Sequence, residues 1–175
     1  MKRVLDGMSG LVHALSRPPA FRPTPLREVI DEVLQRYDLQ IQESGARVRV
    51  TEARLQVTTD PQSLRDALGA LLANALFFND RPQGDRAVSI DCATSEDEAR
   101  ICVSDNGIGI DPRWVGQVFE LGLKLDKSRG GGPGYGLYLA RRLAESLGGS
   151  ISVESTPGEG STFCIRIPGP AGNVS

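Results

Sequence analysis

The chain has 175 residues, with 20 lysines and arginines against 22 aspartates and glutamates and a formal net charge of −2. This length is typical of one domain that can bury a continuous apolar core. A nearly balanced charge gives no broad attraction to nucleic acid or to an anionic membrane surface. We therefore expect neither as a partner, and any ligand has to be recognised by a local site.

The cysteines and the apolar runs of the sequence indicate the cellular compartment in which the chain is expected. Cys92, Cys102 and Cys164 lack metal-type spacing and lie in stretches where a buried free thiol is common, which suggests a reducing compartment. The longest apolar runs, such as 67–78, are far shorter than the roughly 20 residues that cross a bilayer, and no signal-peptide core opens the chain. We expect a soluble, cytoplasmic chain, which could be the cytoplasmic part of a membrane-bound receptor.

The first 24 residues are interpreted as the tail of a preceding helical element and a linker. Apolar residues follow a helical period over 1–16, and prolines interrupt it at 18 and 19. Thr24 is then predicted to cap a helix with Pro25 at its first position, and Ser44-Gly45 ends that helix.

The rest of the sequence predicts both helices and strands. Asp60-Pro61 repeats the cap-then-proline signal and starts a second helix that runs to about Phe78. A third helix is predicted over 138–147, helical turns over 114–119, and strands over 47–51, 55–58, 88–93, 100–103, 151–154 and 162–167. This order predicts an α+β two-layer sandwich with three helices on one face of a mixed sheet. The domain is placed at 25–168, with a flexible tail at 169–175.

The segment Asp105-Asn106-Gly107-Ile108-Gly109 follows a strand and is a candidate binding turn. A buried carboxylate there could accept a hydrogen bond from an exocyclic amine, while the two glycines allow the backbone to approach a flat ring. Alone, the segment is more typical of a turn with a capping aspartate.

Glycines 132, 134 and 136 alternate just before the third predicted helix. A helix N-terminus after such a loop points free N–H groups at an anion, which is a common phosphate-binding arrangement. The segment lacks the ending of a Walker loop, and flexible glycine loops without a ligand are common. Three cations precede it, Lys124, Lys127 and Arg129, which either contact phosphate or are merely solvated.

Asn74 is a polar residue inside the apolar run Leu71 to Leu76. Helical spacing places it on the flank of the buried stripe, where a carboxamide needs a partner, although a solvent-facing position is the simpler reading. Mg²⁺ keeps several waters and takes few protein ligands besides nucleotide phosphates. One amide oxygen is therefore a sufficient protein contribution to a magnesium site.

Taken in order, these segments resemble the boxes of the GHKL ATPase superfamily (Bergerat fold), specifically the catalytic and ATP-binding domain of sensor histidine kinases. The resemblance covers about residues 25–168. Residues 71–75 resemble its asparagine box, 105–109 its first glycine box, 118–120 its phenylalanine box and 132–137 its second glycine box, and 158–163 resemble the closing segment.

The resemblance implies ATP and Mg²⁺ as cofactors and gives each residue an expected role. Asp105 would bind the adenine amino group with Thr162 close by, Phe78 would pack on the base, and Asn74 would ligate magnesium. Gly107 and Gly109 would shape the adenine pocket. Residues 120–133 would form a lid, and phosphate contacts would come from Gly132, Gly134, Gly136 and Leu137, with Lys124, Lys127 and Arg129 as further candidates.

Departures from the family pattern bear on activity. Ala70 replaces the residue that serves as base in the hydrolytic branches, which disfavours autonomous ATP hydrolysis. Phe77 replaces a lysine that contacts phosphate, and Leu121-Gly122 replaces the usual proline and aromatic residue. The single histidine, His13, is followed by alanine instead of the acidic residue of an acceptor motif. We therefore expect the phosphoacceptor to lie outside this chain.

Three functions follow from this sequence. The leading hypothesis is the ATP-binding half of a two-component histidine kinase, which positions Mg-ATP for transfer to a histidine on a separate dimerisation domain and acts indirectly on a response regulator. The alternatives are a nucleotide-binding regulatory module without transfer activity and an anti-sigma-type protein serine kinase of the same superfamily.

Overall fold

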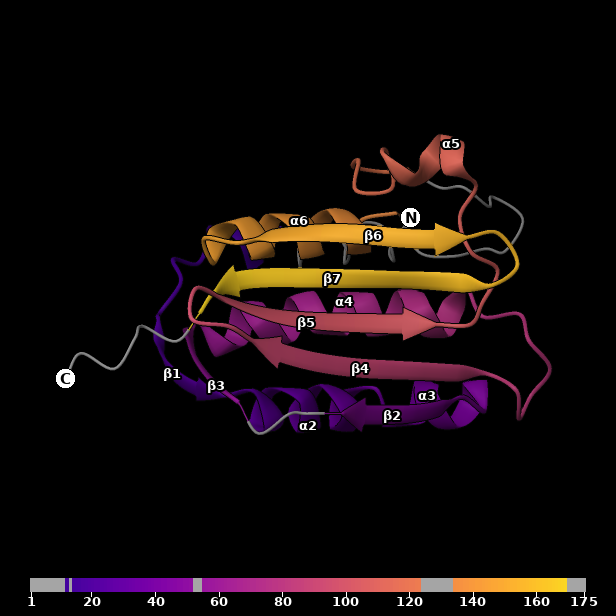
Figure 1. Cartoon of the computed structure of the whole chain (residues 1–175), viewed down its shortest axis with the longest axis horizontal. Coiled ribbons are helices and arrows are strands. Elements are labelled where there is room, and N and C mark those ends of the chain that lie inside the picture. The colour runs from indigo at the N-terminus through magenta and orange to yellow at the C-terminus, as the bar shows by residue number, and fades with distance from the viewer. Residues whose placement is uncertain (1–11, 13, 52–54, 124–133, 170–175) are drawn as a thin grey trace.

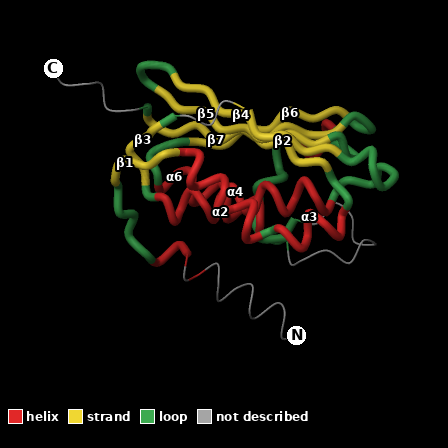
Figure 2. Tube along the Cα trace, turned by 90° about the horizontal axis from the view of Figure 1, so that it is seen from below, coloured by secondary structure: helices red, strands yellow, loops and turns green. Residues whose placement is uncertain are grey.

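The chain folds into two layers, a five-stranded sheet and a layer of helices packed on one of its faces (Figures 1 and 2). The computed structural model describes residues 12, 14–51, 55–123 and 134–169. The opposite face of the sheet carries no helix of the described residues. This arrangement confirms the α+β sandwich predicted from the order of the elements.

The sheet is mixed, with the strand order β2-β4-β5-β7-β6. β2 (Arg47–Thr51) is parallel to β4 (Ala87–Thr94), whereas β5 (Glu98–Asp105), β7 (Gly160–Pro168) and β6 (Ser150–Thr156) continue the sheet in antiparallel pairs. Successive side chains point to opposite faces. Residues such as Ile101 and Ile165 are therefore fully buried against the helices, while their neighbours Arg100 and Arg166 lie on the other, open face.

The helical layer consists of α2 (Leu26–Arg36), α3 (Asp38–Ser44), α4 (Pro61–Phe77) and α6 (Gly136–Ser146), with the short α5 (Pro112–Val115) at one edge of the sheet. α4 begins as predicted, because the Asp60 carboxylate accepts a hydrogen bond from the backbone N–H of Ser63. Its apolar side chains are buried on several sides: Leu64, Leu68, Leu71 and Leu72 are at most 1% exposed. α4 is thus the central helix of the core.

The N-terminal part differs from the prediction. Thr24 does not cap a helix: its hydroxyl donates to the carbonyl oxygen of Arg22, and α2 has no side-chain cap. Residues 22–25 instead form β1 (Arg22–Pro25), which pairs antiparallel with β3 (Gln56–Thr59) in a separate two-stranded sheet. The helix predicted up to Ser44 is divided at Tyr37 into α2 and α3. Strand pairing over a long sequence distance overrides the local cap signal here.

The cysteines also differ from the prediction. Cys102 and Cys164 are not free thiols but form a disulfide between β5 and β7, and only Cys92 is a free, buried thiol. The two bonded residues are 62 positions apart, so only the register of the two strands brings them together. The inference of a reducing compartment from three free thiols therefore loses its basis. Within the described residues, no helix has both the length and the apolar character needed to cross a membrane.

Candidate nucleotide-binding site

Four parts of the chain lie at one end of the sheet, on the right in Figure 1. They are the C-terminal end of α4, the C-terminal end of β5, the turn between β6 and β7, and the N-terminal end of α6. β5 and α4 both end there because the chain returns through β4 between them. Asp105 and Gly134 are therefore at the same end of the molecule.

Asp105 is the last residue of β5 and lies directly opposite Ser161 of β7. One of its carboxylate oxygens accepts a hydrogen bond from the backbone N–H of Gly107 at 2.8 Å. Burial raises the pKa of Asp105 to about 6, although the N–H groups of Gly107 and Ser161 oppose that shift. A carboxylate has about four acceptor positions, so Asp105 can accept a further hydrogen bond from a ligand amine.

The glycines of this turn allow the chain to pack against itself. A Cβ on Gly107 would lie 2.3 Å from the carbonyl oxygen of Phe78, and one on Gly109 would lie 2.1 Å from that of Thr156. Gly109 also has a φ of +68°, in the left-handed region that favours glycine. The space left by the missing side chains is thus filled by neighbouring backbone, and the glycines shape the site without opening it to a ring.

A polar network lies behind this turn, and no residue of it except Asn106 was singled out from the sequence. Asn79 is 3% exposed and donates to the side-chain oxygen of Asn106 at 2.9 Å. Arg81 donates from Nε to the carbonyl oxygen of Asn106 at 2.9 Å and from Nη2 to that of Gly158 at 2.6 Å. Arg81 therefore connects the loop after α4 to the turn after β5 and to the β6–β7 turn. No local sequence signal indicates this role.

The end of α4 places Asn74 and Phe78 beside the glycine turn. The N–H of Phe78 donates to the Asn74 carbonyl at 3.0 Å, and the N–H of Ile108 donates to the Phe78 carbonyl at 3.1 Å. Asn74 and Phe78 are both half-buried, while Phe77 is 43% exposed. The two phenylalanine rings meet edge to face with their centroids 4.9 Å apart.

α6 begins with an uncapped N-terminus. Its N-cap residue is Tyr135, which makes no side-chain capping bond, so the first N–H groups of the helix are not satisfied in that way. A Cβ on Gly136 would meet nothing within 4 Å, and Leu137 in the first turn is half-buried. Gly134 has a φ of +78° and accepts a hydrogen bond from the N–H of Gly122 at 3.2 Å. Lys124, Lys127, Arg129 and Gly132 lie outside the described residues.

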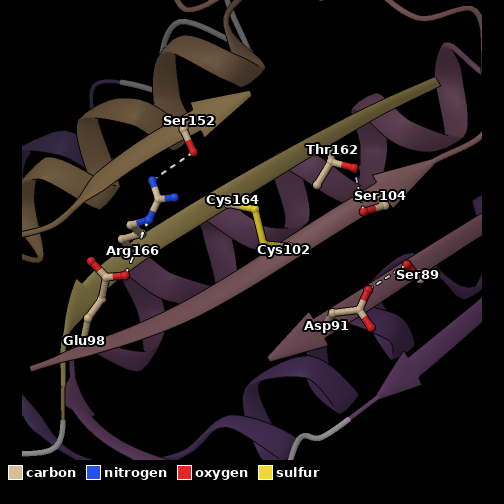
Figure 3. Close-up of a disulfide and its surroundings, with 9 residues drawn as sticks. All are labelled: Ser89, Asp91, Glu98, Cys102, Ser104, Ser152, Thr162, Cys164 and Arg166. Carbon is tan, nitrogen blue, oxygen red and sulfur yellow. Dashed lines mark hydrogen bonds and ion pairs between the residues drawn. A yellow bond between two sulfur atoms is a disulfide. The ribbon is translucent and has the colours of Figure 1, made fainter. Parts of the chain in front are cut away.

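Thr162 lies on the face of the sheet opposite to that of Asp105. Its register neighbour is Ser104, and its hydroxyl donates to that of Ser104 at 2.9 Å on the open face of the sheet (Figure 3). The alternation of side chains puts Ser161 on the same face as Asp105 instead. Ser161 is 8% exposed and its hydroxyl lies 2.9 Å from that of Ser155. Ser161 is therefore the hydroxyl residue on the same face as Asp105.

Comparison with known proteins identifies the family to which the chain belongs. Residues 59–171 match the family described as histidine kinase-, DNA gyrase B-, and HSP90-like ATPase. Over 148 residues, the chain is 35% identical to the phytochrome-like protein Cph1 of Synechocystis, a match that covers 83% of this chain and 19% of that protein. It is 44% identical to the circadian input-output histidine kinase CikA of Synechococcus elongatus over 112 residues, 62% of this chain and 14% of that protein.

Solved structures share the fold. The mycobacterial sensor histidine kinase MprB superposes with a TM-score of 0.74 at 26% identity, over 86% of this chain and 99% of that one. Full-length ShkA in complex with AMPPNP superposes with a TM-score of 0.80 at 22% identity, over 96% of this chain and 36% of that one. The chain thus spans less than a fifth of the two curated relatives above. It belongs to the histidine kinase-, DNA gyrase B-, and HSP90-like ATPase family and is an ATP-binding catalytic domain of the sensor histidine kinase type.

Proposed function

We propose that this chain holds Mg-ATP at the end of the sheet where α4, β5 and α6 meet, and presents the γ-phosphoryl group to a histidine on a separate dimerisation domain. The observation that carries the proposal is the position of the Asp105 carboxylate and the uncapped start of α6 at one end of the fold. One group recognises a base amine and the other an anion. A nucleoside triphosphate offers both at its two ends.

The base-recognising part of the site consists of Asp105, Gly107, Gly109, Phe78 and Ser161. Asp105 accepts from the exocyclic amine of adenine, while the half-buried ring of Phe78 offers an apolar surface to the base. Ser161 takes the role that the sequence analysis gave to Thr162. This choice rests on its register opposite Asp105.

The phosphate-binding part consists of the start of α6 and the loop before it. The N–H groups of Gly136 and Leu137 are the donors, with Gly134 in the preceding turn. Gly132, Lys124, Lys127 and Arg129 complete this part on the strength of the resemblance alone. The AMPPNP complex of ShkA supports a triphosphate as the ligand of such a fold.

The residues present fit a magnesium ion at Asn74. Its carboxamide is half-buried on the last turns of α4, and within the described part of the chain no hydrogen bond to another side chain occupies it. Mg²⁺ with one amide oxygen, waters and phosphate oxygens has an ordinary ligand set. When bound, the ion neutralises phosphate charge, and Asn74 fixes its position relative to the helix.

Catalysis in this chain is then a matter of positioning. Phosphoryl transfer to a histidine needs an aligned nucleophile and neutralised charge, and the chain need not supply a base. The acceptor histidine lies on a separate dimerisation domain of the same kinase, and a response regulator is an indirect partner. The chain acts in the cytoplasm, where ATP is available.

The test is a labelling experiment with γ-phosphate-labelled ATP. The chain is incubated alone and with the purified dimerisation domain of its own full-length protein, with and without Mg²⁺. The proposal predicts label on the acceptor domain only, in a magnesium-dependent reaction that N74A abolishes. Binding without transfer would instead support the regulatory module, and self-labelling of the chain lost in H13A would contradict the assignment of the acceptor.

A further inference from the structure

The disulfide lies on the open face of the sheet, close to the nucleotide site. Cys102 and Cys164 are directly opposite each other in β5 and β7 (Figure 3). Three residues further along β5 is Asp105, and three residues back along β7 is its partner Ser161. The covalent link therefore joins the two strands whose ends hold the base-recognising groups together.

The surroundings of this pair are polar. In Figure 3 the side chains around the disulfide belong to serines, a threonine and charged residues, and the helices lie behind the sheet. Cys102 and Cys164 are 7% and 9% exposed, and they lie on the face of the sheet away from the helical layer. A reagent therefore approaches the pair from the face that no described helix covers.

Cys92 provides the contrast within the same chain. It is paired with Ile101 on the helix-covered face and belongs to the apolar core. Burial, together with the neighbouring Asp91 carboxylate, raises the pKa of its thiol to about 11. A buried thiol that stays protonated does not exchange, because the thiolate is the reactive form. Redox chemistry is therefore confined to the pair on the open face.

We infer that Cys102 and Cys164 form a reversible thiol–disulfide exchange site, and that its oxidised state holds the nucleotide pocket in its tight-binding form. The inference rests on the nucleotide site proposed above. Its co-substrates are low-molecular-weight disulfides for oxidation and a dithiol for reduction. The link limits separation of β5 and β7 next to Asp105, so reduction increases the population in which this end of the sheet is loosened.

The charged neighbours of the two sulfurs differ, and this difference predicts which cysteine attacks the oxidant first. Asp91 of β4 is the register partner of Cys102, and its carboxylate accepts hydrogen bonds from the hydroxyls of Thr51 and Ser89. Cys164 lies two residues before Arg166, whose guanidinium donates to the hydroxyl of Ser152, the register partner of Cys164. Glu98 lies 3.5 Å from Arg166 and neutralises part of its charge, while Arg100 is the register partner of Arg166 on the same face. Arg100 lies two residues before Cys102, as Arg166 lies two residues after Cys164, so the cations do not distinguish the two sulfurs. The difference is Asp91 opposite Cys102, where Ser152 is opposite Cys164. An anion disfavours a thiolate, so Cys164 is the attacking group.

The oxidation balances as two exchange steps. The Cys164 thiolate attacks one sulfur of oxidised glutathione, forms a mixed disulfide and releases one glutathione thiolate. Cys102 then loses its proton to solvent and attacks the Cys164 sulfur, which releases the second glutathione. Two electrons and two protons pass from the protein pair to the reagent, which becomes two thiols.

The first experiment measures reversibility without nucleotide. The chain is equilibrated in glutathione buffers from fully reduced to fully oxidised, trapped by alkylation and read by mass spectrometry. A single two-electron transition of Cys102 and Cys164 is expected, with Cys92 unlabelled until the protein is unfolded. A pair that remains oxidised, or remains reduced, across the whole series would overturn the inference.

The second experiment tests the order of attack. Treated with oxidised glutathione, C102S is expected to accumulate a mixed disulfide on Cys164 faster than C164S accumulates one on Cys102. Equal or reversed rates would overturn the assignment of Cys164 as the attacking group.

The third experiment connects the pair to nucleotide. Reduction of the wild-type chain is expected to raise the Kd for Mg-ATP about threefold, and bound nucleotide is expected to shift the thiol–disulfide equilibrium towards the disulfide by the same factor. C102S/C164S should match the reduced protein in either buffer, while C92A should respond like the wild type. If the double variant does not fold, the Kd values of the oxidised and reduced wild-type chain still test the inference. An unchanged Kd overturns the inference and leaves the proposed function intact, whereas no binding in either state contradicts the proposed function.

Discussion

Arg81 donates a hydrogen bond from Nε to the carbonyl oxygen of Asn106 at 2.9 Å, and its Nη2 reaches the carbonyl oxygen of Gly158 at 2.6 Å. The first contact fixes the residue that follows Asp105, and the second fixes the β6–β7 turn. Asn79 supports the same turn through the Asn106 side chain. The geometry of the base-recognising carboxylate thus depends on a guanidinium that does not itself need to touch the ligand.

R81A is therefore expected to lower the affinity for Mg-ATP about tenfold, because two hydrogen bonds from a charged group are lost and the turn beside Asp105 gains freedom. R81K keeps one donor and should give an intermediate value. Isothermal calorimetry measures the affinity. R27A, which removes an exposed partner of Asp31, is the matched control and should bind like the wild type. Equal affinity in R81A and the wild type would show that the turn is positioned without Arg81.

The raised pKa of Asp105 predicts a pH-dependent effect on stability. The carboxyl is protonated in both states well below its usual pKa of 3.8, and in the folded state it ionises only around pH 6. Stability is therefore lost as the pH rises from about 4 through about 6, by up to about 3 kcal/mol from the size of the shift. D105N cannot ionise and escapes this loss.

Urea unfolding of the wild type and D105N at pH 4 and pH 7.5 measures the effect. The difference between their unfolding free energies should move in favour of D105N at the higher pH, whatever constant offset the substitution introduces. A difference that is the same at both pH values would mean that the carboxyl is not buried as described.

Substitutions of Gly107 and Gly136 distinguish an effect on packing from an effect on ligand binding. G107A would place a Cβ 2.3 Å from the Phe78 carbonyl oxygen and is expected to destabilise the fold by several kcal/mol. G136A meets nothing within 4 Å and removes a flexible residue from the first turn of α6, so its thermal stability should be equal or higher. If phosphates bind at this helix end, the added methyl group crowds them, and the affinity of G136A for Mg-ATP should still fall. If G136A retained the affinity of the wild type for Mg-ATP, the phosphates would not bind at the start of α6.

Phe77 marks a position where this chain departs from the pattern that it resembles. The side chain is 43% exposed on the last turn of α4, and replacing it with lysine loses its edge-to-face contact with Phe78. The replacement places a cation near the helix C-terminus and the proposed phosphates. F77K is expected to raise the affinity for Mg-ATP about threefold to tenfold. L39K changes another exposed apolar residue, 71% exposed on α3, and should leave affinity unchanged. An equal increase in both variants would reflect net charge alone.

Local signals in the sequence were sufficient for the elements that carry strong periodicity. The Asp60-Pro61 start of α4 and the hairpin of β6 and β7 follow from caps, glycines and alternation that act over a few residues. β1 was missed because Arg22–Pro25 becomes a strand only by pairing with β3, some 30 positions later. The disulfide was missed for the same reason, since nothing near Cys102 indicates that Cys164 will lie opposite.

The candidate site shows the same limit at the level of single residues. The turn at Asp105 was found because carboxylate and glycines are adjacent in sequence. The role beside Asp105 was given to Thr162 from the resemblance alone. The sequence leaves open the register that decides the face on which a side chain lies, and a shift of one residue reverses every side chain. The network of Asn79, Arg81 and Asn106 depends on three loops meeting, which only the fold determines.

The most direct test of the nucleotide site compares Mg-ATP with Mg-GTP in one calorimetric titration of the oxidised chain. An adenine amine donates to the Asp105 carboxylate, whereas guanine presents a carbonyl oxygen at the same place and leaves two acceptors facing each other. The account predicts one site per chain for Mg-ATP and affinity for Mg-GTP at least about tenfold weaker, with the preference lost in D105N. Equal affinity for the two nucleotides, or no binding of either, would contradict it.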